Sequence, residues 1–308
     1  MGRISRVYNC QKQRLLMRVY GFLLGTEKKK EFTSKYFPRL FTLFFYFARV
    51  GRFPNLRNPQ DLNEKLLSLK LREYRKDQYI ADCADKYKVR QILIDKGYGH
   101  LLPNLYGVFD YPEDIDFDKL PSQFVIKMNH GSGYNIICKD KDDLNIPNVI
   151  DKLNQWKEKV YGLEYGEWQY SNIIPKTIVE EFLPGLNNDN LIDYKFQCLN
   201  GKVHSIFICY DRTEKFVKFD SYLTDWTRTD YIRPDFRGNR RLLDKPRSLN
   251  EMVKIAEELS ADFEFVRVDL YDIDGQVRFS EFTFTPHSSV LEYYKQEVLD
   301  EMGSCLVI

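Results

Sequence analysis

The stretch from Phe265 to Pro286 constrains the fold most, because apolar and polar residues alternate along it on both sides of an Asp-Ile-Asp-Gly segment. Alternation with a period of two is the pattern of a β-strand that buries one face, so the stretch predicts a β-hairpin. The predicted buried face carries Val266, Val268, Leu270, Phe282 and Phe284. The predicted open face carries Arg267, Asp269, Glu281, Thr283 and Thr285.

The turn of this hairpin sets which side chains lie opposite each other. We expect a three-residue loop with Gly275 in the left-handed backbone region, which pairs Asp272 with Gln276. That register places Arg267 opposite Glu281. Carboxylates beside an arginine suit a site for a nucleotide and a hard divalent cation such as Mg²⁺, which takes oxygen ligands. A solvated sheet face without a ligand is the alternative that the hairpin alone leaves open.

Charge is distributed unevenly along the chain. The formal net charge of the 308 residues is only +1, yet residues 1–52 contain 12 lysines and arginines against Glu27 and Glu31. A basic arm with interleaved apolar residues suits an anionic membrane surface or a polyanion. A basic helix packed on the protein body is the alternative. Nucleic acid is not an expected partner, because no recognised nucleic-acid motif follows the arm.

No segment of the sequence indicates membrane insertion or secretion. The apolar run 40–50 covers about eleven residues, whereas roughly 18 are needed to span a bilayer. The first residues are basic but include no long apolar segment that ends in small residues. The six cysteines and four histidines are scattered, without the spacing of a metal site or a dithiol. We therefore expect a cytoplasmic protein, and contact of the basic arm with the inner membrane face is left open.

Helical and strand patterns fill the rest of the chain, which is long enough for one large domain or two to three subdomains. Helices are expected over Leu62–Leu69, from about Asp77 to Lys96, from Pro147 to about Val160, and over Leu249–Leu259. Strands are expected over Gln123–Met128, Tyr134–Lys139, Thr177–Leu183, Tyr194–Leu199 and Val203–Cys209, the last two joined by a turn at Asn200-Gly201.

Two lysines stand where they suit phosphate binding. Lys127 ends a strand directly before a glycine-rich loop, and Lys86 opens a helix. The loop comprises Asn129, His130, Gly131, Ser132 and Gly133. It is not a Walker A loop, because strand residues follow it rather than a helix. A plain hairpin tip is the alternative, and His130 either lines the loop near a reacting group or shapes its turn.

Two further features bear on a nucleotide or a sugar. The strand 177–183 ends at Pro184-Gly185, where exposed backbone groups at Glu181 and Leu183 suit the edge of an adenine. Asp193, further on, suits ribose hydroxyls. An aromatic cluster could stack on sugar rings or form the core of a lid, and it comprises Tyr161, Tyr165, Trp168 and Tyr170.

The order of these motifs resembles that of the ATP-grasp superfamily. More narrowly, the sequence from about Asn58 to Tyr294 resembles the TupA-like (teichuronopeptide biosynthesis) ATP-grasp family. The motifs that carry the resemblance are Asn63-Glu64-Lys65, Ala84-Asp85-Lys86-Tyr87, Phe117-Asp118-Lys119-Leu120-Pro121, the segment Lys127 to Gly133, Asp193-Tyr194-Lys195-Phe196 and Val266-Arg267-Val268-Asp269-Leu270-Tyr271.

The resemblance implies an α+β ATP-grasp fold, in which two β-layered subdomains clasp a nucleotide. In this chain a helical N-terminal extension is expected to precede that fold. The expected division is a basic helical arm over 1–52, an N-terminal helical and αβ part over 53–120, a lid subdomain with the glycine-rich flap over 121–183, and a C-terminal subdomain with the metal site over 184–308.

The resemblance also implies an activity and its site residues. ATP and Mg²⁺ would serve to phosphorylate a carboxylate, and an amine would then attack the acyl phosphate to form an amide. The implied catalytic residues are Arg267 and Lys127, and the implied metal ligands are Asp269, Glu281 and Thr283. The implied nucleotide-binding residues are Lys86, Lys127, His130, Gly131, Ser132, Gly133, Glu180, Glu181, Leu183, Asp193 and Lys195.

The family further implies a uronic acid of a bacterial surface polysaccharide, or of its precursor, as the carboxylate substrate, and an amino compound as its partner. A glycosyltransferase or sugar kinase of the same pathway is one alternative. A non-catalytic protein that binds nucleotide or glycan is another, and Thr283 favours it slightly, because many ATP-grasp ligases have Asn at that position.

Overall fold

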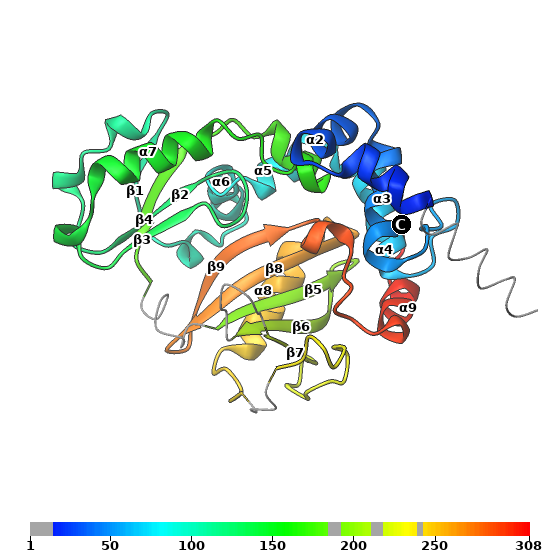
Figure 1. Cartoon of the computed structure of the whole chain (residues 1–308). Coiled ribbons are helices and arrows are strands. Elements are labelled where there is room, and N and C mark those ends of the chain that lie inside the picture. The colour runs from blue at the N-terminus through cyan, green and yellow to red at the C-terminus, as the bar shows by residue number, and fades with distance from the viewer. Residues whose placement is uncertain (1–14, 184–191, 211–217, 239–242) are drawn as a thin grey trace, which may run out of the picture.

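Two antiparallel β-sheets form the framework of the described part of the chain (Figure 1). The computed structural model describes residues 15–183, 192–210, 218–238 and 243–308. The first sheet has the strand order β1 (Leu105–Phe109), β4 (Thr177–Glu181), β2 (Phe124–Met128) and β3 (Asn135–Cys138). The second sheet has the order β7 (Lys218–Tyr222), β6 (Lys202–Tyr210), β5 (Asp193–Leu199), β8 (Phe265–Ile273) and β9 (Gln276–Thr283). Together with the helices, these sheets confirm the expected α+β class.

Helices precede the sheets in the chain. They are a stretch over residues 15–24, α2 (Glu27–Tyr36), α3 (Pro38–Val50) and α4 (Leu62–Leu69). Pro38 stands in the first turn of α3, where its missing N–H has no helical partner to lose. The Asp61 carboxylate accepts a hydrogen bond from the N–H of Glu64 and so caps α4. Among the described helices, none combines the length and the apolar character needed to cross a bilayer.

Part of the basic arm is bound to the protein body. The Arg49 guanidinium lies 2.9 Å from the Glu292 carboxylate, and that of Arg52 lies 2.6 Å from the carboxylates of Asp61 and Glu64. Aromatic and aliphatic side chains behind these ion pairs form a core cluster that includes Leu24, Phe41, Phe45, Tyr46, Leu67, Trp168 and Val290. The C-terminal half of the arm is therefore packed on the body, and its first 14 residues lie outside the described ranges.

The single helix predicted over 77–96 is wrong, because two helices occupy this range. They are α5 (Gln78–Ala84) and α6 (Lys88–Asp95). Asp85 between them has an extended backbone, and its side chain accepts the N–H groups of Tyr87 and Lys88. The following N–H, of Lys86, donates to the carbonyl of Asn129 in the glycine-rich loop. A tertiary contact therefore competes with the helical hydrogen bond and breaks the helix.

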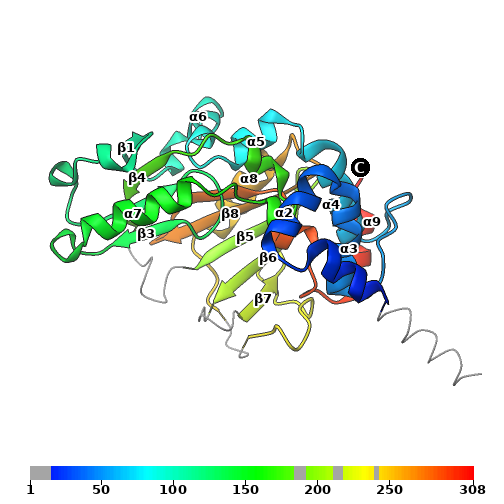
Figure 2. The same cartoon turned by 45° about the horizontal axis from the view of Figure 1, so that its top comes forward.

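The first sheet has its own core. The hairpin of β2 and β3 and helix α7 (Ile146–Lys157) form as expected, and α7 lies along this sheet (Figure 2). The buried side chains between them include Phe117, Phe124, Ile126, Met128, Val149, Leu153 and Val179. Since β1 pairs with β4, the sheet also takes in a strand from the 53–120 segment.

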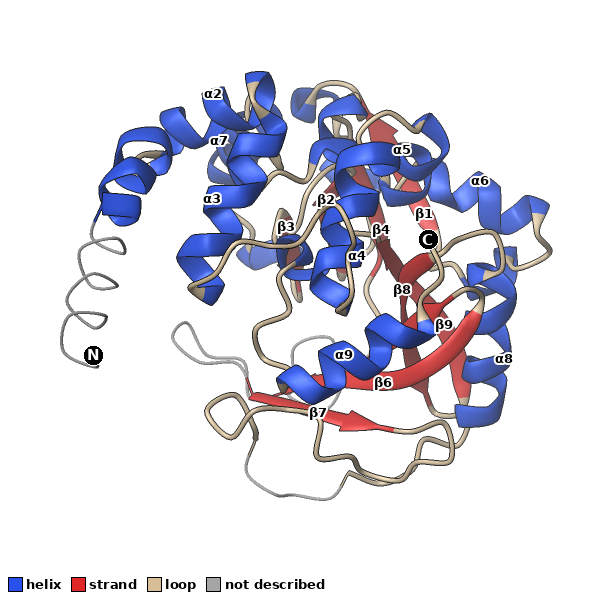
Figure 3. Cartoon of the chain, turned by 90° about the vertical axis from the view of Figure 1, so that its right-hand side faces the viewer, coloured by secondary structure: helices blue, strands red, loops and turns tan. Residues whose placement is uncertain are grey.

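The second sheet packs on helix α8 (Leu249–Ser260), as Figure 3 shows. Helix α9 (Gln296–Cys305) lies against α4 on the other side of the molecule. The apolar face predicted for the Phe265–Pro286 hairpin is confirmed, because its five members are all at most 3% exposed. Helix α8 thus covers the apolar face of the sheet, and the charged face is turned toward the first sheet.

The predicted register of this hairpin is wrong. Asp274 and Gly275 both have positive φ, +53° and +86°, and form a two-residue turn that pairs Ile273 with Gln276. The twist of such a two-residue turn matches the right-handed twist of the flanking strands. A bulge at Ser280 then adds one unpaired residue to β9, so the side chains beyond it point to the faces on which they were predicted.

The consequence of this turn and bulge is a different set of partners on the same face. Arg267 lies opposite Thr283, and Asp269 lies opposite Glu281. All four side chains remain on the predicted polar face, because the shorter turn and the extra bulge residue compensate each other in the two-residue period of the strands.

Candidate functional site

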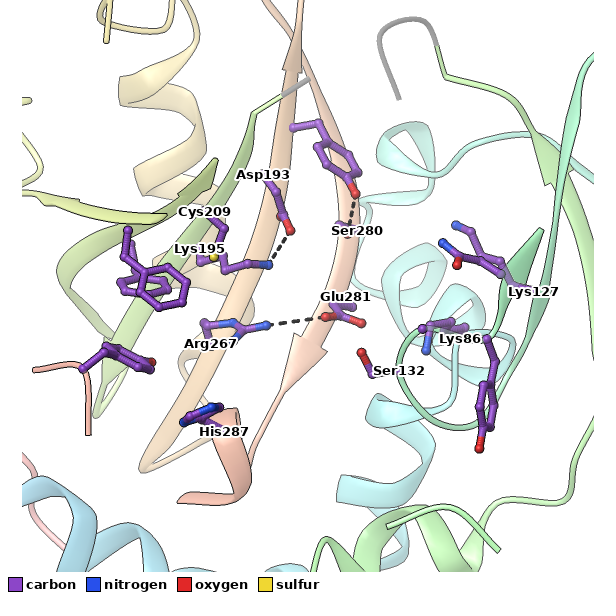
Figure 4. Close-up of a pocket in the computed structure, with 17 residues that line it drawn as sticks. Lys86, Lys127, Ser132, Asp193, Lys195, Cys209, Arg267, Ser280, Glu281 and His287 are labelled. Atoms are coloured by element: carbon purple, nitrogen blue, oxygen red, sulfur yellow. Dashed lines mark hydrogen bonds and ion pairs between the residues drawn. The ribbon is translucent and has the colours of Figure 1, made fainter. Parts of the chain in front are cut away.

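A cavity of about 580 Å³ separates the polar faces of the two sheets. Figure 4 shows Lys86, Lys127 and Ser132 on one side of it. Residues from the second sheet form the other side, and they are Asp193, Lys195, Arg267, Ser280 and Glu281. Aromatic side chains also line it, namely Tyr134, Phe207, Phe219, Tyr271 and Tyr293. A volume between 300 and 1,000 Å³ is typical of a small-molecule site.

The strand register places three charged groups in one row across the second sheet. Lys195 on β5 lies opposite Asp269 on β8, which lies opposite Glu281 on β9. The Lys195 ammonium contacts the carboxylates of Asp193 and Asp269. Arg267 binds Asp269 through two hydrogen bonds of 2.7 Å. The sheet thus links two cations and three carboxylates in one chain of ion pairs.

Burial and charge act against each other in this row. Burial raises the pKa of the fully buried Asp269 carboxyl, although Arg267 and Lys195 oppose the shift. Burial alone would also raise the pKa of Glu281, but the cations Lys86, Lys195 and Arg267 outweigh it and lower that pKa. The pKa of Lys195 is raised, because its carboxylate neighbours outweigh the effect of its burial. Each ionised form is therefore maintained by its neighbours.

The first sheet presents two lysines to the same cavity. The Lys127 ammonium lies 2.8 Å from the buried Glu180 carboxylate, whose other oxygen lies 2.8 Å from Arg90. The Lys86 ammonium donates to the carbonyl of Gly131 at 2.5 Å. Burial lowers the pKa of Lys86, and Glu281 across the cavity opposes that shift. Both lysines thus face the carboxylate row.

The glycine-rich loop borders the cavity through Ser132 and Gly133. Gly131 and Gly133 have φ of +81° and +77°, and a Cβ on Gly131 would lie 2.6 Å from the Tyr161 ring. Only glycine fits there without displacing the ring. The loop begins at Asn129, whose amide donates to the Asp85 carboxylate at 2.9 Å.

Some predicted residues lie away from this cavity. His130 is 2% exposed and packs against Tyr134, so it is not among the lining residues. The N–H of Glu181 donates to the Asn104 carbonyl at 2.8 Å, which corrects the expectation that it is free for an adenine edge. Leu183 is buried and does not line the cavity. Pro184 and Gly185, the predicted break, lie outside the described residues.

The aromatic cluster has two environments. Trp168 is 5% exposed and donates its ring N–H to the Ser34 carbonyl, so it belongs to the core. Tyr161, Tyr165 and Tyr170 line a second chamber, of about 360 Å³, next to the first cavity. Sequence patterns alone did not indicate this chamber or its residue Glu167, because elements far apart in the chain form it.

The donor set of the carboxylate row is compatible with Mg²⁺. Glu281 offers oxygen ligands at the cavity wall, and Asp269 is directly paired with it but is fully buried and contacts Arg267 and Lys195. In the described part of the chain no three His, Cys, Asp or Glu side chains gather as a metal group, but Mg²⁺ beside substrate phosphates commonly uses only one or two carboxylates. The Thr283 hydroxyl accepts a hydrogen bond from Arg267 at 2.9 Å and contacts Glu281 at 3.4 Å. Its present contacts therefore orient Arg267 and Glu281.

Comparison with known proteins identifies the class of this chain. The sequence profile described as TupA-like ATPgrasp matches residues 64–307, which include both sheets and every lining residue named above. The fold is accordingly of the α+β ATP-grasp class, with a helical N-terminal extension. The chain belongs to the TupA-like ATP-grasp family.

Several solved structures are similar to this chain at low sequence identity. A D-alanine–D-alanine ligase from Bacillus anthracis has a TM-score of 0.45 and 17% identity, over 73% of this chain and 64% of the ligase. The corresponding enzyme from Helicobacter pylori has a TM-score of 0.41 and 15% identity, over 73% and 61%. The ATP-grasp ligase PsnB has a TM-score of 0.40 and 11% identity, over 79% and 66%. The chain thus spans less than two thirds of each of these proteins, and no curated protein matches it.

Proposed function

We propose that the protein is an ATP-dependent ligase that joins a carboxylate to an amine. The observation that carries this proposal is the cavity between the sheets, where Lys86 and Lys127 face Lys195, Arg267 and Glu281. The fully buried Asp269 is not a lining residue, but it pairs with Lys195 and Arg267. Cations on both sides of the cavity suit the negative charges of a polyphosphate. Membership of the ATP-grasp family accounts for the arrangement of two facing sheets.

The reaction would proceed in two displacements. A carboxylate oxygen of the acceptor attacks the γ-phosphorus of ATP, the terminal phosphoanhydride bond breaks, and ADP leaves. The amine nitrogen then attacks the acyl carbon, the carbon–oxygen bond to phosphate breaks, and phosphate departs with the electron pair while nitrogen loses a proton. The acyl phosphate must be kept from water, and the loop with Ser132 and Gly133 stands at the border where it can cover the phosphates.

The side chains divide these tasks by position. Lys86 and Lys127 would neutralise phosphate charge, together with the backbone N–H groups of Gly131, Ser132 and Gly133. Lys195 and Arg267 would face the transferring phosphoryl group from the second sheet. Asp269 and Glu281 would hold Mg²⁺, which when bound supplies further positive charge to the phosphate oxygens.

Binding of a phosphate requires the lysines to leave their present partners. Lys127 now pairs with Glu180, which is about 4% exposed. A buried carboxylate left without a cation is costly. Glu180 keeps Arg90 at 2.8 Å when Lys127 turns away, so the exchange of Lys127 from Glu180 to phosphate leaves no uncompensated charge.

The activity can be tested by ADP release with a panel of uronic acids and amino acids. We expect release only when ATP, an acid and an amine are all present, and we expect Glu281→Gln to abolish it. Glu251→Gln on the exposed side of α8 is the matched control and should retain it. Release that requires a sugar hydroxyl and no carboxylate would indicate a sugar kinase instead, and unchanged glycan or nucleotide binding with no turnover would indicate a binding protein.

The carboxylate substrate is, in this proposal, a uronic acid of a bacterial surface polysaccharide or its precursor. The support for it is the family alone, because the sequence motifs resemble those of the teichuronopeptide-biosynthesis branch of the ATP-grasp ligases. The panel tests it directly, because release with simple amino acids as the only carboxylates would contradict a sugar acid.

We also propose that the arm contacts an anionic membrane surface, where a lipid-linked precursor would be found. Helix α2 supports this, because Phe32, Tyr36 and Phe37 are 54–57% exposed beside the exposed lysines Lys28, Lys29 and Lys35. Deletion of residues 1–52 would remove Phe41 and Tyr46 from the core, so charge reversal of the three lysines is the better test. Sedimentation with phosphatidylserine vesicles should fall in that variant and stay unchanged with phosphatidylcholine; equal sedimentation of both proteins would refute the contact.

A further inference from the structure

A second chamber of about 360 Å³ opens beside the nucleotide cavity. The two share four lining residues, which are Ser132, Arg267, Glu281 and His287. The ligase proposal assigns the first cavity to ATP, so the second chamber adjoins the position at which the acyl phosphate would form. A ligand in it would reach the reacting carbon from the side opposite the nucleotide.

The walls of this chamber are aromatic and turn backbone. Tyr161, Tyr165 and Tyr170 form one wall, and the turn Pro286–Ser289 forms another. His287 and Ser288 in that turn have left-handed φ of +50° and +60°. The buried Lys70 ammonium donates to the Ser288 carbonyl at 2.8 Å and so holds the turn in place.

Whereas Glu281 lines both cavities, Glu167 is the carboxylate that lines this chamber alone. Its side chain is nearly buried, at 9% exposure, and lines the chamber. The Thr285 hydroxyl donates to the Glu167 carboxylate at 2.9 Å and accepts from the Gln169 amide at 2.7 Å. This chain of hydrogen bonds sets the orientation of the carboxylate before any ligand arrives.

Glu167 has no ion pair among the described residues. The cation that affects its pKa most is Lys70, whose ammonium donates to the Ser288 carbonyl rather than to Glu167. Burial raises the pKa of Glu167, although Lys70 opposes the shift, so without a further cation the site disfavours the ionised carboxylate. A cation that enters the chamber would favour the ionised form of Glu167 and pair with it.

We propose that the second chamber binds the amine substrate, and that Glu167 is the carboxylate that receives its ammonium group. The inference rests on the proposed ligase function and adds the location and the charge of the amine. The tyrosine wall suits the same ligand, because aromatic faces attract an ammonium. Arg267 at the border of the two chambers suits the acid partner, whereas Glu167 lines the second chamber and not the first.

The test uses hydroxylamine, which is uncharged near neutral pH and traps an acyl phosphate as a hydroxamate. The probes are glucuronate and galacturonate as acids, and alanine, lysine and glutamate as amines. We expect Glu167→Gln to raise the KM for the amine roughly tenfold or more, because one contact to the ammonium group is lost. Hydroxamate formation and the KM for ATP should stay within about twofold of the wild-type values. Glu164→Gln, three residues away and outside the chamber, should change none of these values.

The possible results distinguish failure of the amine-site inference from failure of the ligase proposal. Hydroxamate from the wild type with an unchanged amine KM in Glu167→Gln would overturn this inference and leave the ligase proposal standing. No hydroxamate from the wild type with either acid would overturn both. If Glu167→Gln misfolds and fails to bind ATP, the variant Tyr165→Lys replaces it in the test. Tyr165 is 38% exposed, so a lysine there places a repelling charge at the chamber without disturbing the buried hydrogen bonds of Glu167. An amine KM that Tyr165→Lys leaves unchanged would equally overturn the inference.

Discussion

At the scale of single residues, the candidate site depends on the row formed by Lys195, Asp269 and Glu281. Asp269 is fully buried and contacts both Lys195 and Arg267. A buried charge is stable only when it is paired, so each member of the row requires the others. The row therefore serves the stability of the fold as well as the proposed chemistry.

We expect Asp269→Asn to lower the free energy of unfolding by about 3–5 kcal/mol, because it leaves two cations partly uncompensated in the core. It should also abolish ATP turnover. Urea denaturation and ADP release measure the two effects. Asp262→Asn is the control, since this 55%-exposed carboxylate pairs with Lys96 at the surface and should cost less than about 1 kcal/mol. Wild-type turnover in Asp269→Asn would remove this carboxylate from the site.

Glu281 should make stability depend on pH in the acid range. Its pKa in the folded protein lies below the ordinary value of 4.5, because nearby cations outweigh burial. The unfolded chain then binds the proton more readily, so the contribution of Glu281 is fully present above pH 4.5 and is lost as the pH falls through the folded pKa. Wild type and Glu281→Gln should therefore differ most in unfolding free energy near neutral pH and converge in acid. A difference that grows as the pH falls would contradict the assigned direction.

At the scale of elements, the break between α5 and α6 connects a helix end to the glycine-rich loop. Asp85 accepts the N–H of Tyr87 at 2.8 Å and the Asn129 amide at 2.9 Å. The same side chain thus caps α6 and holds the start of the loop. A local defect in one helix is in this way part of the cavity wall.

We expect Asp85→Ala to lower the unfolding free energy by about 1–3 kcal/mol and to raise the KM for ATP, because the cap and the loop contact are lost together. Asp77→Ala is the matched control. Asp77 caps α5 through the N–H groups of Tyr79 and Ile80 but does not contact the loop. Its loss should cost about 1 kcal/mol of stability and leave the KM for ATP unchanged. Equal KM values for the two variants would show that Asp85 acts only as a cap.

At the scale of the whole molecule, two separate cores face each other across the site. One core lies under the first sheet with α7, and the other lies between the second sheet and α8. A nucleotide that contacts cations from both sheets would connect these cores. Ligand binding should therefore stabilise the folded state measurably.

A non-hydrolysable ATP analogue with Mg²⁺, at about 100 times its Kd, should add about 2.7 kcal/mol to the unfolding free energy. Lys127→Met should reduce this gain, because it removes a cation from one wall of the cavity. Thermal unfolding with and without the analogue measures the effect. Lys139→Met, an exposed position after β3, is the control and should show the full gain. The same gain in both variants would place the phosphates away from Lys127.

The sequence alone determined the type and the buried face of most elements. Alternation along 265–285 was sufficient to place Arg267, Asp269, Glu281 and Thr283 on one polar face, because side-chain direction in a strand depends only on position along it. The Asn200-Gly201 turn, with φ of +47° and +75°, also formed where its residues indicated. Such features are local, so neighbouring residues specify them.

Only the tertiary structure decided which groups meet. The bulge at Ser280 set the Asp269–Glu281 pairing, and the contact of Lys86 with Asn129 divided the helix predicted over 77–96. The chamber around Glu167 joins the segment after α7 to the turn after β9, more than a hundred residues later. Register, helix breaks and cavities depend on contacts between distant segments, and their free energy exists only once the chain has folded.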